Sequence, residues 1–403
     1  MEEIQTSDPV SLRGHWILDP EVHFLNHGSY GACPSAVLDE QRSWRDRIER
    51  QPVAFFGLEL RNHLDEAREK LASFLGCDGS GLVFVPNVTT GVNAVLRSLE
   101  FGPGDEILIT NHGYNACNNA AQFVCDRSGA TIVRASLPFP CRGPDEAFEA
   151  ILAAATDNTR LALVDHITSP TGMLLPIARI VQALQGRGID VMVDGAHAPG
   201  QVPLDLDALG AAYYAGNCHK WLCTPKGSGL LHVRSDRRDR VRPTTISHGA
   251  NTARSGHTRL QDEFDWPGTI DPTPWLCVPF AIEFLGGLLP GGWDEIRAQN
   301  HRLALAARTR LSEALGVEPP LPTEMIANMT AFPLPAAEDD APRGAFSCDP
   351  LQARLIETHR VEIPISSWPA PPERVLRVSA QLYNDEQDLE ALILGLEAEG
   401  LTC

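Results

Sequence analysis

Apolar and polar residues alternate along the chain in a pattern that predicts a parallel β-sheet covered by helices. Short apolar runs of strand length occur at 82–85, 106–110, 131–134, 161–164 and 191–194. Helix-length segments follow them, beginning near Thr90 and Asn115 and covering 145–155 and 177–185. Strands that are apolar on both faces and separated by helices form mostly parallel sheets buried on both sides. In such sheets the ligand lies at the carboxyl ends of the strands.

The flanking parts of the chain show other patterns. Helical periodicity covers 36–49 and 58–75 before the first strand. After residue 277 the pattern is α+β, with helices expected at 278–288, 293–315, 350–359 and 385–399 and strands at 329–334, 361–366 and 375–380. We therefore predict an N-terminal segment, 1–23, that packs on a small C-terminal domain, 278–403, and a large domain, 24–277. Between 247 and 274 the periodicity is lost, so a long functional loop is expected there.

The composition and the net charge of the chain exclude some classes of binding partner. The 403-residue chain is 43% hydrophobic and 21% charged, as ordinary soluble globular proteins are. Its formal net charge of -19 argues against nucleic acid or an anionic membrane as a partner. No apolar run approaches the ~18 residues that span a bilayer, and the polar start is unlike a signal peptide, so we expect a cytoplasmic protein. The ten cysteines show no metal-ligand spacing, and no metal site is expected.

The stretch 213–222 holds a single lysine, Lys220, among aromatic and small apolar residues. A buried ammonium without a partner costs several kcal/mol or loses its proton. A desolvated lysine forms Schiff bases with carbonyl compounds, and pyridoxal phosphate is the commonest cofactor held in this way. A strand-end lysine that reaches solvent is equally compatible with this stretch alone.

Polar residues at two further strand ends suit the same cofactor. Asp194 ends the apolar run 191–193, where a buried carboxylate needs a cationic partner such as a protonated pyridine nitrogen. Thr89 and Thr90 stand where a helix begins, and the free N–H groups and dipole of a helix start favour a phosphate. His197 follows Asp194 and can hydrogen-bond the phenolic oxygen of the ring. An ordinary threonine N-cap and a histidine with a packing role are the structural alternatives.

Several motifs together resemble the class V aminotransferase superfamily of fold type I pyridoxal phosphate enzymes. They are Asp194-Gly195-Ala196-His197, Gly216-Asn217-Cys218-His219-Lys220-Trp221, Thr89-Thr90 with Asn93, and Leu376-Arg377-Val378-Ser379-Ala380-Gln381-Leu382-Tyr383-Asn384. Within the superfamily, 26–31 and 170–172 resemble the isopenicillin N epimerase-like branch. The resemblance implies an α/β fold: a large domain with a mostly parallel seven-stranded sheet flanked by helices, and a smaller α+β C-terminal domain.

The resemblance also implies roles for individual residues. Lys220 would form the Schiff base with the cofactor and, once released by the substrate, would carry the substrate α-proton. Asp194 would pair with the pyridine nitrogen, and Arg377 would bind the substrate carboxylate through a bidentate fork. Thr89, Thr90 and His219 would contact the phosphate, and Ser169 and His197 would contact the phenolic oxygen. Tyr114 or, as second choice, His112 would stack on the face of the ring.

Further implications concern the neighbouring subunit, the substrate and the reaction class. Thr269 matches a position that reaches the phosphate of the other subunit, so a homodimer with shared active sites is implied. The residues implied to contact the substrate are Asn26, His27 and Gly28. No cysteine occurs at 363–369, where cysteine desulfurases of the superfamily carry their nucleophile, and Cys348 is expected to be buried or to cap a helix. A persulfide-forming desulfurase is therefore disfavoured.

The remaining enzymatic reactions all begin with transfer of the α-proton of an amino acid or cysteine conjugate to Lys220. Reprotonation on the opposite face gives an epimer and needs a second acid, which the sequence does not identify. Loss of a β-thiol gives aminoacrylate and then pyruvate, and it needs only a leaving group. Epimerisation ranks first because of the branch resemblance, and carbon–sulfur lysis ranks nearly equal. Transamination is less favoured, and a non-enzymatic binding protein is disfavoured.

Overall fold

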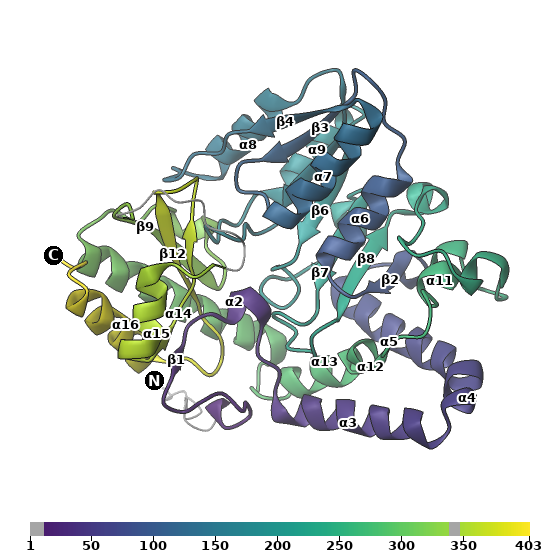
Figure 1. The fold of residues 1–403 in the computed structure, drawn as a ribbon, viewed down its shortest axis with the longest axis horizontal. Helices are drawn as coiled ribbons and strands as arrows, with labels where there is room; N and C mark the ends of the chain where they lie inside the picture. Colours follow the sequence, from purple (N-terminus) through teal and green to yellow (C-terminus); the bar gives the residue numbers. More distant parts are fainter. Residues whose placement is uncertain (1–11, 338–346) are drawn as a thin grey trace.

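The protein is organised around a seven-stranded sheet, shown in Figure 1 for a computed structural model that describes residues 12–337 and 347–403. The strands are β2 (Leu82–Val85), β3 (Glu106–Thr110), β4 (Thr131–Ala135), β5 (Thr159–Asp165), β6 (Asp190–Gly195), β7 (Tyr213–Asn217) and β8 (Gly229–Val233). Their order is β2-β8-β7-β6-β5-β3-β4, and β8 runs antiparallel to both of its neighbours. The predicted mostly parallel sheet is confirmed.

Helices cover both faces of this sheet. One layer consists of α5 (Leu60–Leu75), α8 (Pro144–Ala154) and α9 (Ile177–Gly186), and the other of α6 (Val88–Ser98) and α7 (Asn115–Ser128). Successive strand residues point to opposite faces, so in β2 Leu82 and Phe84 pack under the first layer while Val83 and Val85 pack under the second. Both faces of the central strands are therefore buried, which explains why these strands are mostly apolar.

The segment 247–274, expected to be one long loop, contains a helix that belongs to the core. This helix, α11 (Arg259–Phe264), starts with a capping box in which Thr258 and Gln261 bond each other's backbone. Its Leu260 and Phe264 are buried against the second face of the sheet. The expectation was wrong for these residues because a six-residue helix is too short to show a clear period among Gly, Asp and Thr.

Further helices lie between these elements along the chain. They are α2 (His27–Tyr30), α3 (Ser35–Arg50), α4 (Pro52–Ala54), α10 (Leu206–Leu209), α12 (Thr273–Leu276), α13 (Val278–Gly286), the π-helix η1 (Phe55–Glu59), and the 3-10 helices η2 (Gly79–Gly81), η3 (Ser235–Arg240), η4 (His248–Asn251) and η5 (Thr323–Met325). Within residues 12–337 and 347–403, none of the helices has both the length and the apolarity to cross a membrane.

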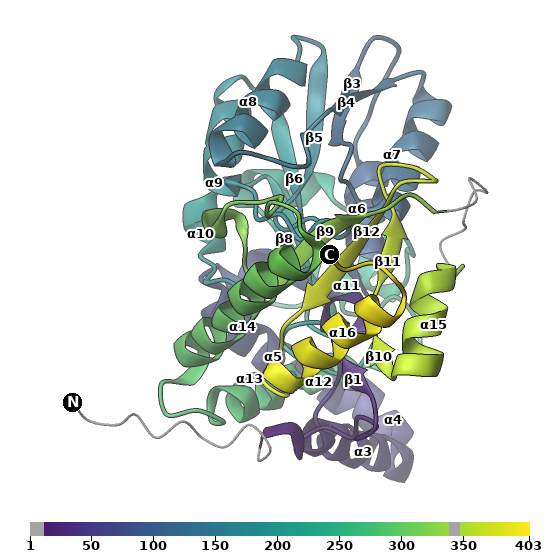
Figure 2. The ribbon, with the colours of Figure 1, turned by 90° about the vertical axis from the view of Figure 1, so that its left-hand side faces the viewer.

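A second, smaller sheet follows in the C-terminal part. Its strands β9 (Met329–Leu334), β11 (Ile365–Ser367) and β12 (Arg374–Ser379) pair antiparallel in the order β11-β12-β9. The helices beside it are α14 (Gly292–Leu315), α15 (Pro350–His359) and α16 (Glu386–Ala398), seen in Figure 2. The strand expected at 361–366 is two strands, because β10 (Val361–Glu362) pairs elsewhere.

The N-terminal segment contacts this C-terminal part. β1 (His23–Phe24) pairs in parallel with β10, and His23 Nδ1 lies 2.7 Å from Asp388 Oδ1 of α16. Trp16 packs edge-on against Tyr383, with ring centroids 5.1 Å apart. Residues 1–11 of the predicted segment lie outside the described residues. The domain boundaries at residues 23 and 277 stay a prediction.

Candidate active site

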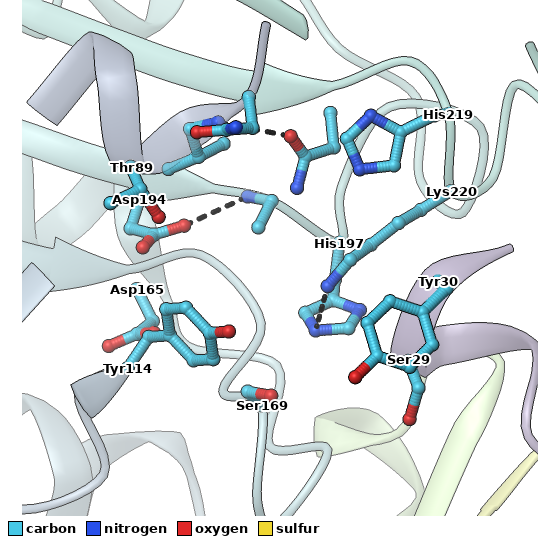
Figure 3. A pocket seen from close by; sticks show the side chains of 14 residues that line it. Ser29, Tyr30, Thr89, Tyr114, Asp165, Ser169, Asp194, His197, His219 and Lys220 are labelled. Atoms are coloured by element: carbon cyan, nitrogen blue, oxygen red, sulfur yellow. Dashed lines mark hydrogen bonds between the residues drawn. The ribbon is translucent and has the colours of Figure 1, made fainter. Parts of the chain in front are cut away.

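A cavity of about 240 Å³ lies at the carboxyl ends of the central strands (Figure 3). Asp165 of β5, Asp194 of β6 and Asn217 of β7 reach it together, because parallel strands bring their carboxyl ends to one edge of the sheet. The residues expected from the sequence that line it are Thr89, Tyr114, Ser169, Asp194, His197, His219 and Lys220. The rest of the wall includes Ser29, Tyr30, Asn87, Val88 and Ala196.

Lys220 lies at the floor of this cavity, where the charged form of its amine is disfavoured. Burial, and next the Arg377 guanidinium, lower the pKa of Lys220 from 10.5 to about 7. Its Nζ lies 3.2 Å from Nε2 of His197. Trp221 donates its indole N–H to Nδ1 of His197 (3.4 Å), so the imidazole proton is on Nε2 and is donated to the Lys220 amine. A neutral amine is the form that attacks a carbonyl.

Asp194 is a buried carboxylate without a full cationic partner. It accepts hydrogen bonds from the Ala196 N–H (3.0 Å) and the Cys117 thiol (3.2 Å), neither of which is charged. Burial raises the pKa of Asp194, and the Lys220 amine opposes this only in part. Asp165, its register partner on β5, has a pKa raised well above the usual range by burial and by the charge of Asp194. A cation placed against Asp194 would therefore favour its ionised form.

The helix start beside the cavity differs in detail from the expectation. α6 begins at Val88 rather than at Thr90, and its N-cap is Asn87, whose side chain accepts from the Thr90 N–H (2.9 Å). The Val88 N–H is also occupied, because Asn217 Oδ1 accepts it (3.0 Å). Thr89 lines the cavity, whereas the Thr90 hydroxyl donates to Asn87 and is not on the cavity wall.

His219 also lines the cavity, next to Lys220 (Figure 3). Its Nδ1–H donates to the Ser228 carbonyl at 2.7 Å, which leaves Nε2 free for a ligand. Burial lowers the pKa of His219 to about 4. An anion bound at Nε2 would favour the protonated ring.

Arg377 is a buried guanidinium behind two cavity residues. It is 5% exposed and donates to the Ser169 carbonyl and to Ser29 Oγ (3.3 Å). Within residues 12–337 and 347–403, no carboxylate pairs with it, and its Nε has no hydrogen-bond partner. Burial lowers its pKa to about 10. A buried cation without a counter-ion is costly, so the site favours an anionic ligand.

The residues expected to face the substrate at the N-terminal segment lie behind the wall instead. His27 is fully buried, donates Nε2–H to the Lys220 carbonyl (3.0 Å) and accepts the Tyr383 hydroxyl at Nδ1 (2.8 Å). Burial lowers its pKa to about 3. Asn26 and Gly28 are likewise not on the cavity wall, and their predicted substrate contacts stay predictions. The segment meets the cavity through Ser29 and Tyr30.

Other expected residues are placed as follows. Tyr114 lines the cavity, whereas His112 is buried away from it, with Nδ1 2.8 Å from Thr171 Oγ1. Thr269 is exposed and does not line the cavity of its own chain. Cys348 is exposed rather than buried, and the following residue, Asp349, caps α15 in its place.

The sequence pattern contained signals for two cavity residues that were not singled out. Asp165 follows the apolar run 161–164 just as Asp194 follows 191–193, so the strand-end rule identifies both carboxylates. Tyr30 stands inside the motif 26–31, but its side-chain direction depends on the turn that follows.

Gly31 holds that turn against the lysine backbone. It has a φ of 72°, and a Cβ on it would lie 2.1 Å from the His219 carbonyl oxygen and 2.9 Å from Lys220 Cα. We expect Gly31→Ala to weaken cofactor retention and to lower stability, with about 1–3 kcal/mol from the left-handed strain alone. Thermal melting and cofactor titration check this. Gly102→Ala, where a Cβ meets nothing within 4 Å, is the matched control, and equal behaviour of the two variants would contradict the expectation.

The chemistry of these groups fits pyridoxal phosphate. A neutral lysine amine suits its aldehyde, a buried carboxylate without a full cationic partner suits its ring nitrogen, and the helix start with His219 suits its phosphate. The unpaired guanidinium of Arg377 suits the carboxylate of an amino acid.

Comparison with known proteins agrees with this fit. The family model described as Aminotransferase class-V matches residues 34–392. Isopenicillin N epimerase of Amycolatopsis lactamdurans is 37% identical over 394 residues, which cover 94% of this chain and 96% of that protein. Putative L-cysteine desulfhydrase 2 of Oryza sativa subsp. japonica is 33% identical over 426 residues, covering 96% of this chain and 86% of that protein.

A solved structure shows the same fold with the cofactor in place. It is a variant of C-DES with glycine covalently linked to its pyridoxal phosphate, at a TM-score of 0.77 and 22% identity, covering 97% of this chain and 99% of that chain. With the match to the class-V aminotransferase model, the cofactor of the protein is pyridoxal phosphate. Both the length of the family match and the identity to the relatives assign the protein: the chain belongs to the class-V aminotransferase family.

Proposed function

We propose that the protein is an epimerase or racemase of an α-amino acid in which Lys220 moves the α-proton. The observation that carries the proposal is the buried amine of Lys220, whose pKa is lowered to about 7 in a cavity shared with Asp194 and backed by Arg377. The identity to isopenicillin N epimerase along nearly the whole chain supports epimerisation as the outcome.

Each residue has one task in this proposal. When bound, pyridoxal phosphate supplies an electron-withdrawing ring that stabilises negative charge at the substrate α-carbon. Asp194 keeps the ring nitrogen protonated, and Arg377 binds the substrate carboxylate, which orients the α-hydrogen toward Lys220. The neutral Lys220 amine then accepts the α-proton. Thr89 and His219 bind the phosphate, and Ser169 and His197 contact the phenolic oxygen. Tyr114 stacks on the face of the ring.

Carbon–sulfur lysis is the second candidate. It is supported by the 33% identity to a putative L-cysteine desulfhydrase. It would use the same α-proton transfer and differ afterwards, when a β-thiol leaves as thiolate. Persulfide formation is disfavoured because, in the part of the chain that the structure describes, no cysteine lines the cavity.

We also propose a homodimer with shared active sites. Thr269 is exposed and lies away from the cavity of its own chain, as a residue that serves the neighbouring subunit would. Its hydroxyl would add a donor to the phosphate held by Thr89 and His219.

The function is tested with the holoenzyme, S-substituted L-cysteines and a panel of L-amino acids in deuterated water. Epimerisation predicts α-deuteration with loss of optical purity, and lysis predicts pyruvate. Lys220→Ala is expected to abolish both, together with the visible absorption band of the cofactor Schiff base. Protein that shows no such band after addition of pyridoxal phosphate would contradict the whole assignment.

A further inference from the structure

Tyr30 stands on the cavity wall without an assigned role. It is the last residue of α2, directly after Ser29, and it is 71% exposed. Within residues 12–337 and 347–403, its hydroxyl has no hydrogen-bond partner. Figure 3 shows this hydroxyl turned into the cavity, across from the phenol of Tyr114. An unbonded hydroxyl at this place is free to act on a ligand.

The backbone of Tyr30 is fixed next to that of Lys220. The following residue, Gly31, packs so closely that its Cβ position is 2.9 Å from Lys220 Cα. Lys226 Nζ donates to the Gly31 carbonyl at 2.8 Å, and His27 at the start of α2 bonds the Lys220 carbonyl. The backbones from which the two side chains extend are therefore held together, which helps to place both groups at one carbon.

The two side chains approach the cavity from different depths. Lys220 is 9% exposed and bonds His197, which is 1% exposed, so the amine is at the floor. Tyr30, at 71% exposed, is at the mouth. The amine and the phenol can therefore reach a bound ligand from different depths of the cavity.

Tyr30 also lies at the substrate end of the cavity. Its neighbour Ser29 accepts from Arg377 Nη2, the guanidinium assigned to the substrate carboxylate. Tyr114, the other phenol at the mouth, stands beside Asp165 at the end assigned to the ring nitrogen (Figure 3). Of the two phenols, that of Tyr30 is therefore the one nearer to the expected position of the substrate α-carbon.

We propose that Tyr30 is the second proton-carrying residue of the epimerisation, acting on the face of the α-carbon opposite Lys220; this rests on the proposed function. In the L-to-D direction the α-carbon–hydrogen bond breaks, and the proton passes to the Lys220 amine. The Tyr30 O–H then gives its proton to the other face of the α-carbon. The resulting ammonium and phenolate return to their starting forms by exchange with solvent, which the exposed phenol permits. In the D-to-L direction the roles are reversed.

The test uses holoenzyme in deuterated water and the panel amino acid that wild type deuterates fastest, as pure L and pure D forms. Tyr30→Phe is expected to deuterate the L form with retained configuration near the wild-type rate. Its interconversion of L and D is expected to fall by roughly 10²–10⁴-fold, the usual worth of a positioned acid. The change in the cofactor spectrum on adding the D form should persist, because binding does not need the hydroxyl. Tyr213→Phe, a buried tyrosine in the second core layer, is the matched control.

The other outcomes overturn the inference. Tyr30→Phe that interconverts the enantiomers at the wild-type rate shows that another group supplies the proton. Equal loss of L-form deuteration and of interconversion shows that Tyr30 serves binding or structure. Wild type that deuterates the L form without ever forming the D form overturns the role of Tyr30 and leaves α-deprotonation by Lys220 intact. Wild type that deuterates no amino acid overturns the proposed function itself.

Discussion

Arg377→Lys is expected to lower kcat/KM for the amino acid substrate by roughly a hundredfold. The guanidinium bonds Ser169 and Ser29 with two of its nitrogens and still has donors for a carboxylate. A lysine ammonium is a point charge without this planar fork, so it cannot serve both serines and the ligand. Hydrogen bonds to charged groups are worth about 1.5–3 kcal/mol each, and roughly 1.4 kcal/mol corresponds to tenfold.

Steady-state kinetics with two substrates check this expectation. The two substrates are the amino acid and the corresponding amine without its carboxylate. The amine should react equally poorly with wild type and with Arg377→Lys, because neither protein can form the contact with the missing carboxylate. Arg374→Lys is the matched control, since Arg374 is on the same strand but pairs with Asp349 at 2.9 Å. If the amino acid retains its wild-type kcat/KM in Arg377→Lys, the carboxylate binds elsewhere.

Lys220→Met is expected to stabilise the cofactor-free protein at neutral and lower pH. The pKa of Lys220 is about 7 in the folded protein against 10.5 normally, because burial disfavours the charged amine. Below pH 7 the folded state carries the full cost of the buried charged amine, which a pKa shift of this size sets at about 5 kcal/mol. Between about pH 7 and 10.5 the unfolded chain binds a proton that the folded chain does not. The stability of wild type therefore rises with pH across this window, and the advantage of Lys220→Met disappears.

Thermal melting of the two cofactor-free proteins from pH 6 to 10 measures this effect. The difference in Tm should be largest at the low end and should shrink as the pH rises. Lys70→Met, at a partly exposed lysine paired with Glu283, controls for loss of a charge and should show no such trend. A Tm difference that does not change with pH would mean that Lys220 is charged in the folded protein.

The location of the cavity was predictable because it depends on local patterns. A strand buried on both faces must be apolar, so β3, β5 and β6 appear in the sequence within a few residues of their true bounds. Charged residues that interrupt or end such runs, as Lys220 and Asp194 do, must have partners and therefore indicate a site.

Details that depend on contacts between distant segments were not predictable. The start of α6 is set by Asn87 and by Asn217 from another strand, which moves it ahead of Thr90. His27 belongs to a motif that suggested substrate contact, but the approach of Tyr383 places it in the core. The second face of the sheet buries α11, a helix too short to be read from its own period.

By itself, the sequence determined the parallel sheet, the edge at which a ligand binds, and the lysine and carboxylate expected there. These follow from short-range patterns, since burial of both sheet faces and the cost of isolated charges constrain residue type at each position. Only the tertiary structure decided which side chains face the cavity and from which depth. Lys220 at its floor and Tyr30 at its mouth are 190 residues apart in the chain, and their relation arises from the packing of Gly31 on the lysine backbone.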